Sequence, residues 1–168
     1  MSEKKPIYNP EYWRDRLRSF QLRHQAIYVC GEDVWKAIED RHRVLLRQYI
    51  KPEDSVLDAG CGWGRLLTLL PDYWKGDYLG VDLCPDFLEL ARHEHPSRDF
   101  VCGDFRELQK HTKEKRFDWA VLISIRPMII NNIGEAGWEA VRDELQQVCD
   151  RILFLEYVTD DKGEILES

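Results

Sequence analysis

The chain has 168 residues, of which 43% are hydrophobic, and a formal net charge of −7. That length suits one domain with its own core, and no apolar run reaches the roughly 20 residues needed to cross a bilayer. The charge argues against a broad nucleic-acid surface, which requires clustered Lys and Arg. The charged start "MSEKKPIYNP" lacks the apolar segment of a secretory signal, so we expect a cytoplasmic protein without membrane contact.

The first 50 residues have the hydrophobic spacing of helices. In "EDVWKAIEDRHRVLLRQYI", Val34, Ile38, Leu45 and Tyr49 recur near one face at intervals of about 3.6 residues. A segment this short buries too little surface to fold alone. We therefore expect residues 1–50 to form a helical extension of the same domain and residues 51–168 to form its core.

An arginine-rich stretch lies within this extension. The segment "YWRDRLRSFQLRHQ" carries Arg14, Arg16, Arg18 and Arg23, which could form a local basic patch. The alternative, which we favour, is a solvated helix face whose arginine stems extend over a neighbouring element.

After residue 50, short apolar runs alternate with helical stretches. The runs are "SVLDAG", "DYLGVDL", "DFVCGD", "FDWAVLISI" and "RILFLEYV", and several are almost continuously apolar, as strands buried on both faces are. The order predicts an α/β fold with a parallel, doubly wound sheet and right-handed crossovers.

The segments between these runs read as amphipathic helices. "GRLLTLL" is stopped by Pro71, and "PDFLELARHE" has a proline at its start. In "EAGWEAVRDELQQVCD" the apolar side chains fall at i, i+3, i+7 and i+10. The positions predicted to face inward are Phe87, Leu88, Ala91, Trp138, Val141, Leu145 and Val148.

The first apolar run leads into a glycine-rich turn, "VLDAGCGWGRL". Ligands of doubly wound sheets bind at the carboxyl ends of the strands, and glycines there allow a tight turn and close approach of the backbone. Arg65 occupies the third glycine position of a dinucleotide fingerprint, and no G-K-[ST] ending of a phosphate-binding loop is present. A nicotinamide oxidoreductase is therefore disfavoured, while a glycine turn without a ligand stays open at this point.

The turn and the runs after it resemble the motifs of the class I S-adenosylmethionine-dependent methyltransferases. "VLDAGCGWGRL" is similar to motif I, "YLGVDLCPDFLELA" to motif II, "FVCGDF" to the third motif and "FDWAVLISI" to the fourth, in the family's order across residues 51–158. The resemblance implies a Rossmann-like, mostly parallel sheet of strand order 3-2-1-4-5. It implies S-adenosylmethionine as cofactor and S-adenosylhomocysteine as product.

The resemblance also assigns cofactor-binding residues. Asp82 would accept hydrogen bonds from the ribose hydroxyls, with helix capping as its alternative role, and Asp58 would order the glycine loop or reach the ammonium group. Asp104 would accept from the adenine amino group, with Leu83, Phe105 and Ser124 around the ring or packed in the core. The predicted set is Asp58, Gly60, Gly62, Gly64, Asp82, Leu83, Asp104, Phe105 and Ser124.

The methyl acceptor is only partly constrained. The loop expected after the fourth strand, "SIRPMIINNIG", lacks the [DNS]-P-P-[YFW] signature of DNA amino-methylating enzymes and the Pro-Cys pair of cytosine-C5 enzymes. With the negative charge, this favours a small molecule over nucleic acid. Weak catalytic candidates are Arg126, Glu156 and Tyr157, and candidate pocket residues of the extension are Tyr12, Trp13, Arg16, His24 and Tyr28.

The C-terminal end departs from the family pattern. "RILFLEYV" is followed only by "TDDKGEILES", so we expect a sheet without strands 6 and 7, whose fifth-strand edge is covered by the N-terminal helices or by a second subunit of a homodimer. The shortened sheet leaves a non-catalytic cofactor-binding or accessory protein as one alternative. A nucleic-acid or protein methyltransferase is another.

The cysteines give no sign of a metal site. Cys30, Cys61, Cys84, Cys102 and Cys149 are scattered, with no C-x-x-C pair and no histidine at ligand spacing. We expect reduced thiols and no bound metal.

Overall fold

A five-stranded parallel sheet forms the centre of the computed structural model, which describes residues 9–20, 31–156, 158–159 and 165–166. Its strand order is β3-β2-β1-β4-β5, the order that the resemblance implied. The strands are β1 (Val56–Ala59), β2 (Tyr78–Asp82), β3 (Asp99–Cys102), β4 (Phe117–Ile123) and β5 (Cys149–Leu155).

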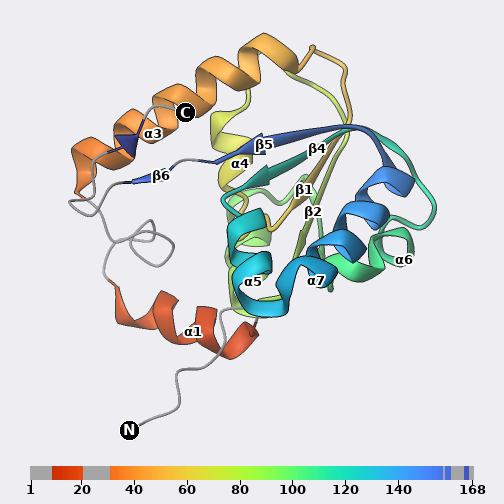
Figure 1. Cartoon of the computed structure of the whole chain (residues 1–168). Coiled ribbons are helices and arrows are strands. Elements are labelled where there is room, and N and C mark those ends of the chain that lie inside the picture. Colours follow the sequence, from red (N-terminus) through yellow and green to blue (C-terminus); the bar gives the residue numbers. More distant parts are fainter. Residues whose placement is uncertain (1–8, 21–30, 157, 160–164, 167–168) are drawn as a thin grey trace, which may run out of the picture.

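Helices cover both faces of this sheet (Figure 1). One buried cluster joins the strands to α3 (Glu32–Tyr49), α4 (Arg65–Leu69) and α5 (Pro85–Glu94). The other joins them to η1 (Phe105–Glu107), α6 (Leu108–Thr112) and α7 (Arg126–Val148). The predicted inward positions of α5 and of the second half of α7 are all buried.

The inward face of α3 differs from the prediction. Ile38, His42 and Leu46 are buried, whereas Tyr49 is 42% exposed. Buried His42 on this face receives a hydrogen bond from Arg65 at 3.1 Å, which helps to hold this polar side chain inward. Burial and the arginine charge lower the pKa of His42 to about 3, so its ring is neutral and can accept.

Arg65, the first residue of α4, ties the extension to the glycine loop. Its guanidinium carbon lies 4.1 Å from the ring centre of Trp35, and its Nε lies 3.7 Å from Glu39. Both partners belong to α3. A buried charge held by three groups of one helix fixes the start of α4, and with it the end of the loop before it.

The stretch after β4 is helical, which corrects the expected loop. α7 begins at Arg126, with Pro127 in its first turn. Gly134, with φ 74° and ψ 177°, interrupts the helix and divides it into two parts. The first part reaches the carboxyl end of the sheet, and the second packs against its face through Trp138, Val141 and Leu145.

β5 is an edge strand whose ladder partner is β4. The short strands β6 (Val158–Thr159) and β7 (Ile165–Leu166) form a separate antiparallel pair and do not extend the main sheet. Phe154 on β5 is 39% exposed beside Trp138. The expectation that a second copy covers this edge stays a prediction.

No helix in the described ranges is long and apolar enough to cross a membrane. The described cysteines are free thiols, of which Cys61, Cys84 and Cys149 are buried and Cys102 is exposed. Cys30 lies outside the described residues.

Candidate functional site

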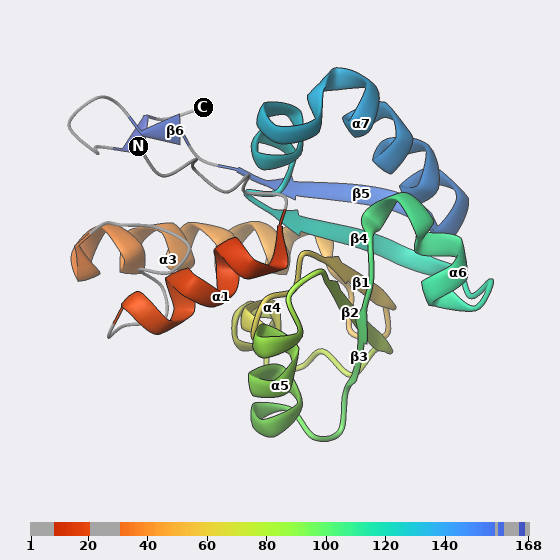
Figure 2. The same cartoon turned by 90° about the horizontal axis from the view of Figure 1, so that it is seen from below.

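A cavity of about 300 Å³ lies at the carboxyl ends of the strands, where α1 (Pro10–Ser19) passes across them (Figure 2). Its wall is mainly aromatic and aliphatic, with a few polar groups. Such a concave apolar site with few polar groups is typical of small-ligand binding. The sequence-predicted residues that line it are Tyr12, Trp13, Arg16, Gly60, Gly62, Asp82, Leu83, Phe105 and Ser124.

The glycine loop forms the floor of this cavity. Gly60 and Gly62 have φ values of 90° and 52°, in the left-handed region that favours glycine. A Cβ on Gly60 would lie 2.3 Å from Ile125 Cδ1, whereas a Cβ on Gly62 would meet no atom within 4 Å. Gly60 is therefore needed for packing, and Gly62 leaves open space above its backbone.

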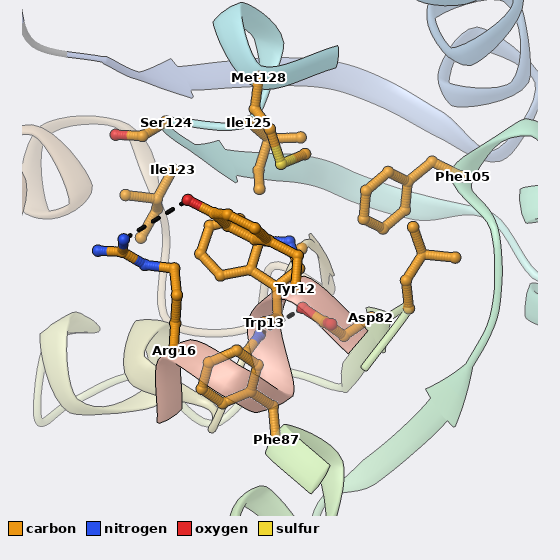
Figure 3. A pocket seen from close by; sticks show the side chains of 13 residues that line it. Tyr12, Trp13, Arg16, Asp82, Phe87, Phe105, Ile123, Ser124, Ile125 and Met128 are labelled. Carbon is orange, nitrogen blue, oxygen red and sulfur yellow. Dashed lines mark hydrogen bonds between the residues drawn. The ribbon is translucent and has the colours of Figure 1, made fainter. Parts of the chain in front are cut away.

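Asp82 connects the loop to the next helix. Its Oδ2 accepts a hydrogen bond from the Gly62 amide at 2.9 Å (Figure 3), and its Oδ1 accepts one from the Cys84 amide at 2.8 Å. Burial raises the pKa of Asp82, and the backbone amides oppose that rise. Each carboxylate oxygen has a second acceptor position, so the group can also accept from a ligand in the cavity.

Helix α1 covers the cavity. Asn9 caps the helix by accepting a hydrogen bond from the Glu11 amide, and Trp13 packs 6.4 Å from the ring of Phe87. Arg14 donates to Asp86 on α5 at 3.0 Å. Arg18 also lies 3.8 Å from Asp86, so α1 is held to the core at the cavity by both apolar and ionic contacts.

Arg16 and Tyr12 lie at the end of the cavity away from Phe105 (Figure 3). Arg16 Nη1 donates to the Tyr12 hydroxyl at 3.5 Å, and its guanidinium lies 4.9 Å from the Phe20 ring centre. This pair gives the cavity a cationic end, while Asp82 and Phe105 lie toward the opposite end.

Five predicted residues do not line the cavity. Asp58 is buried beneath the loop and accepts a hydrogen bond from the Tyr78 hydroxyl at 2.7 Å. Burial raises the pKa of Asp58 to about 7, against the lowering effect of that bond. Gly64 precedes α4 with φ 82°.

The other three are Asp104 after β3, Arg126 at the start of α7 and Glu156 after β5. Asp104 caps η1 and pairs with Arg106 at 2.6 Å. Arg126 lies 5.7 Å from the ring centre of Trp138, and Glu156 follows β5. Burial raises the pKa of Glu156, and the charge of Arg126 opposes that rise.

The remaining predicted residues His24, Tyr28 and Tyr157 lie outside the described residues. Within the described ranges, no group of three or more His, Cys, Asp or Glu side chains is placed to hold a metal ion.

The prediction missed four lining residues. Phe87 belongs to the α5 face that the spacing assigned to the core, and Ile123 ends β4. Ile125 and Met128 belong to the segment that was expected to be a loop. Pro127 at the start of an apolar stretch was the available signal that a helix begins there.

A comparison with protein families matches residues 56–150, more than half of the chain, to a family described as "Methyltransferase domain". Curated relatives match either a short stretch at higher identity or a longer stretch at lower identity. The chain is 36% identical over 76 residues to the ribosomal protein L11 methyltransferase of Cupriavidus pinatubonensis, covering 45% of this chain and 25% of that protein. It is 26% identical over 160 residues to the sphingolipid C9-methyltransferase of Candida albicans, covering 85% of this chain and 31% of that protein.

The chain thus spans less than a third of the length of these two curated relatives.

Solved structures share its fold. PH0226 from Pyrococcus horikoshii superposes with a TM-score of 0.57 at 26% identity, covering 76% of this chain and 59% of that chain.

The magnesium protoporphyrin IX methyltransferase ChlM from Synechocystis, solved with bound S-adenosylmethionine, gives a TM-score of 0.60 at 16% identity, covering 94% of this chain and 73% of that chain. At that identity the likeness concerns the fold alone, whereas the family match concerns the sequence and includes the glycine loop and Asp82. The chain belongs to the class I S-adenosylmethionine-dependent methyltransferases.

Proposed function

We propose that the cavity binds S-adenosylmethionine with its adenosine toward Asp82 and Phe105 and its methionine part along Gly60 and Gly62. The open space above Gly62 supports this, because a ligand can lie directly on that backbone. The free acceptor positions of Asp82, at the cavity wall, suit a ribose with two hydroxyl donors. Arg16 and Tyr12 at the other end suit the carboxylate of the methionine part.

The cofactor supplies an activated methyl group on a positively charged sulfur. The protein then has to align an acceptor with that methyl group and exclude water, and alignment alone can supply up to about 7–11 kcal/mol of the barrier. Trp13 and Phe87 close the cavity on the α1 side, and Ile125 and Met128 close it on the α7 side. These apolar walls support methyl transfer to an enclosed acceptor.

We propose a small molecule as that acceptor. The cavity is small and mostly apolar, the chain carries a net charge of −7, and the segment after β4 lacks the signatures of DNA methyltransferases. Proteins, lipids and carrier-bound acyl groups appear in the names of relatives, so these acceptor classes belong in the same assay.

The first test is calorimetry with S-adenosylmethionine, followed by transfer of labelled methyl to a panel of metabolites, lipids, proteins and nucleic acids. We expect micromolar to millimolar binding and labelling of at least one small molecule. Absence of binding at millimolar cofactor contradicts the proposal. Binding without transfer to any acceptor supports the non-catalytic alternative.

Arg16→Met should weaken S-adenosylhomocysteine binding by about 10-fold, because a bond to a charged group is lost. Binding of 5′-methylthioadenosine, which has no amino-acid carboxylate, should stay within about 2-fold. Competition calorimetry measures both. Equal losses for the two ligands would show that Arg16 acts through the packing of α1 instead.

A further inference from the structure

Two buried polar atoms at neighbouring strand ends have no hydrogen-bond partner. They are Oγ of Ser124, which follows β4, and Oε1 of Glu156, which follows β5. The Ser124 amide donates to the Leu155 carbonyl at 3.1 Å, so the two residues adjoin at the carboxyl end of one parallel pair. Burying such atoms unpaired costs free energy, which a ligand can recover by bonding to them.

Ser124 is also held in a costly backbone conformation. Its φ of 57° is positive, and the other non-glycine residues with positive φ in the described ranges, Lys113 and Glu114, lie in the turn before β4. Ser124 alone of these three lines the cavity. Strain of this kind is retained where surrounding structure enforces it and often marks a functional position.

Ser124 lies at the end of the cavity away from Asp82 and Phe105 (Figure 3). That end is beyond the region proposed for the adenosine. A group bound beside Ser124 would therefore lie next to the methionine part of the proposed cofactor, on the side from which an acceptor would approach the methyl group.

Glu156 brings a carboxyl group to the strand end beside Ser124. Among the described residues no cation lies within 4.0 Å of its carboxylate, and the charge acting on it is that of Arg126 at the start of α7. The Arg126 guanidinium packs over Trp138. The Glu156 carboxyl group therefore lies at the strand end next to Ser124, which lines the cavity, and its Oε1 has no hydrogen-bond partner.

Building on the proposed function, we propose that Ser124 and Glu156 form the acceptor subsite and that the reacting group of the acceptor is an amino group. In the reaction, the nitrogen lone pair forms the bond to the methyl carbon while the carbon–sulfur bond breaks and its electron pair stays on sulfur. Positive charge moves onto nitrogen, and one N–H proton passes to the Glu156 carboxylate. A carboxylate stabilises that developing charge, whereas it repels a carboxylate acceptor.

The test uses three small probes on the protein saturated with S-adenosylhomocysteine, and again without it: benzylamine, benzyl alcohol and benzoate. Ligand-observed NMR gives the dissociation constants. We expect benzylamine to bind more tightly than the other two probes. Glu156→Gln should weaken benzylamine binding by about 10-fold or more. Ser124→Gly, which removes the hydroxyl and relieves the positive φ, should weaken it by about 3-fold.

Asp150→Asn is the matched control. It removes one carboxylate from β5, the strand that Glu156 follows, at an exposed position paired with Arg116, and it should leave benzylamine binding unchanged. Far-UV circular dichroism and an unchanged affinity for S-adenosylhomocysteine establish that Glu156→Gln is folded.

Unaltered benzylamine binding in Glu156→Gln overturns the subsite. Tighter binding of benzyl alcohol or benzoate than of benzylamine overturns the choice of an amino group. If the wild-type protein does not bind S-adenosylhomocysteine, that result contradicts the proposed function and leaves the question of the subsite separate. The probe series without S-adenosylhomocysteine still decides the role of Glu156 in that case.

Discussion

Asp82→Asn should lower the affinity for S-adenosylmethionine by at least about 100-fold. The Asp82 carboxylate already accepts hydrogen bonds from two backbone amides, of Gly62 and Cys84. An asparagine has one acceptor oxygen, so its NH₂ group would face one of those donors. The ribose would lose a charged acceptor, and the glycine loop would lose a hydrogen bond that holds it. We expect the two losses together to reduce the binding free energy by more than about 2.7 kcal/mol.

Calorimetry measures this affinity, with near-UV circular dichroism as the check on folding. The control is Asp77→Asn, which removes a carboxylate from an exposed position bonded to Lys115 and should change the affinity by less than about 2-fold. An Asp82→Asn protein that is folded and binds within 3-fold of wild type contradicts the proposed position of the ribose.

Asp58→Asn should stabilise the fold, and more so at high pH. Burial raises the pKa of Asp58 from an ordinary 3.8 to about 7. Between these values the folded protein holds a proton that the unfolded chain releases, so the stability falls as pH rises through this window and stays low above it. Asparagine does not titrate and can still accept from the Tyr78 hydroxyl.

The expected gain in unfolding free energy is up to about 4 kcal/mol at pH 8 and less than about 2 kcal/mol at pH 5. Urea denaturation at the two pH values measures it. Asp150→Asn also removes one negative charge, but at the surface, and so reports the general effect of net charge. A gain that is equal at both pH values, or a loss at pH 8, contradicts the assigned pKa.

The core of the site could be predicted from the sequence because its signals are local. A buried strand, a glycine turn and an acidic residue at the end of the next strand follow one another in the chain, and parallel pairing brings their carboxyl ends together. Gly60, Gly62 and Asp82 meet at the cavity for that reason. The inward side chains of α5 and α7 followed equally from helical periodicity.

The remaining features depend on contacts between distant segments. The inward face of α3 is set partly by the bond between His42 and Arg65, which are 23 residues apart, and a scale of hydrophobicity does not place a histidine inward. Asp58 was assigned to the loop or the cofactor, but Tyr78 from the neighbouring strand binds its carboxylate. Hydrophobic spacing carries no information on such pairs.

The kink at Gly134 separates two tasks within one helix. The part before it contributes Met128 to the cavity wall and Ile129 to the core, whereas the part after it serves only the core, through Trp138 and Leu145. Substitutions at cavity-facing positions of the first part, such as Met128, can reshape the wall of the cavity, whereas substitutions at the buried Ile129 would also disturb the core. An enzyme built this way can acquire new substrates at small cost to its stability, and a designer can vary the same few positions to redirect it.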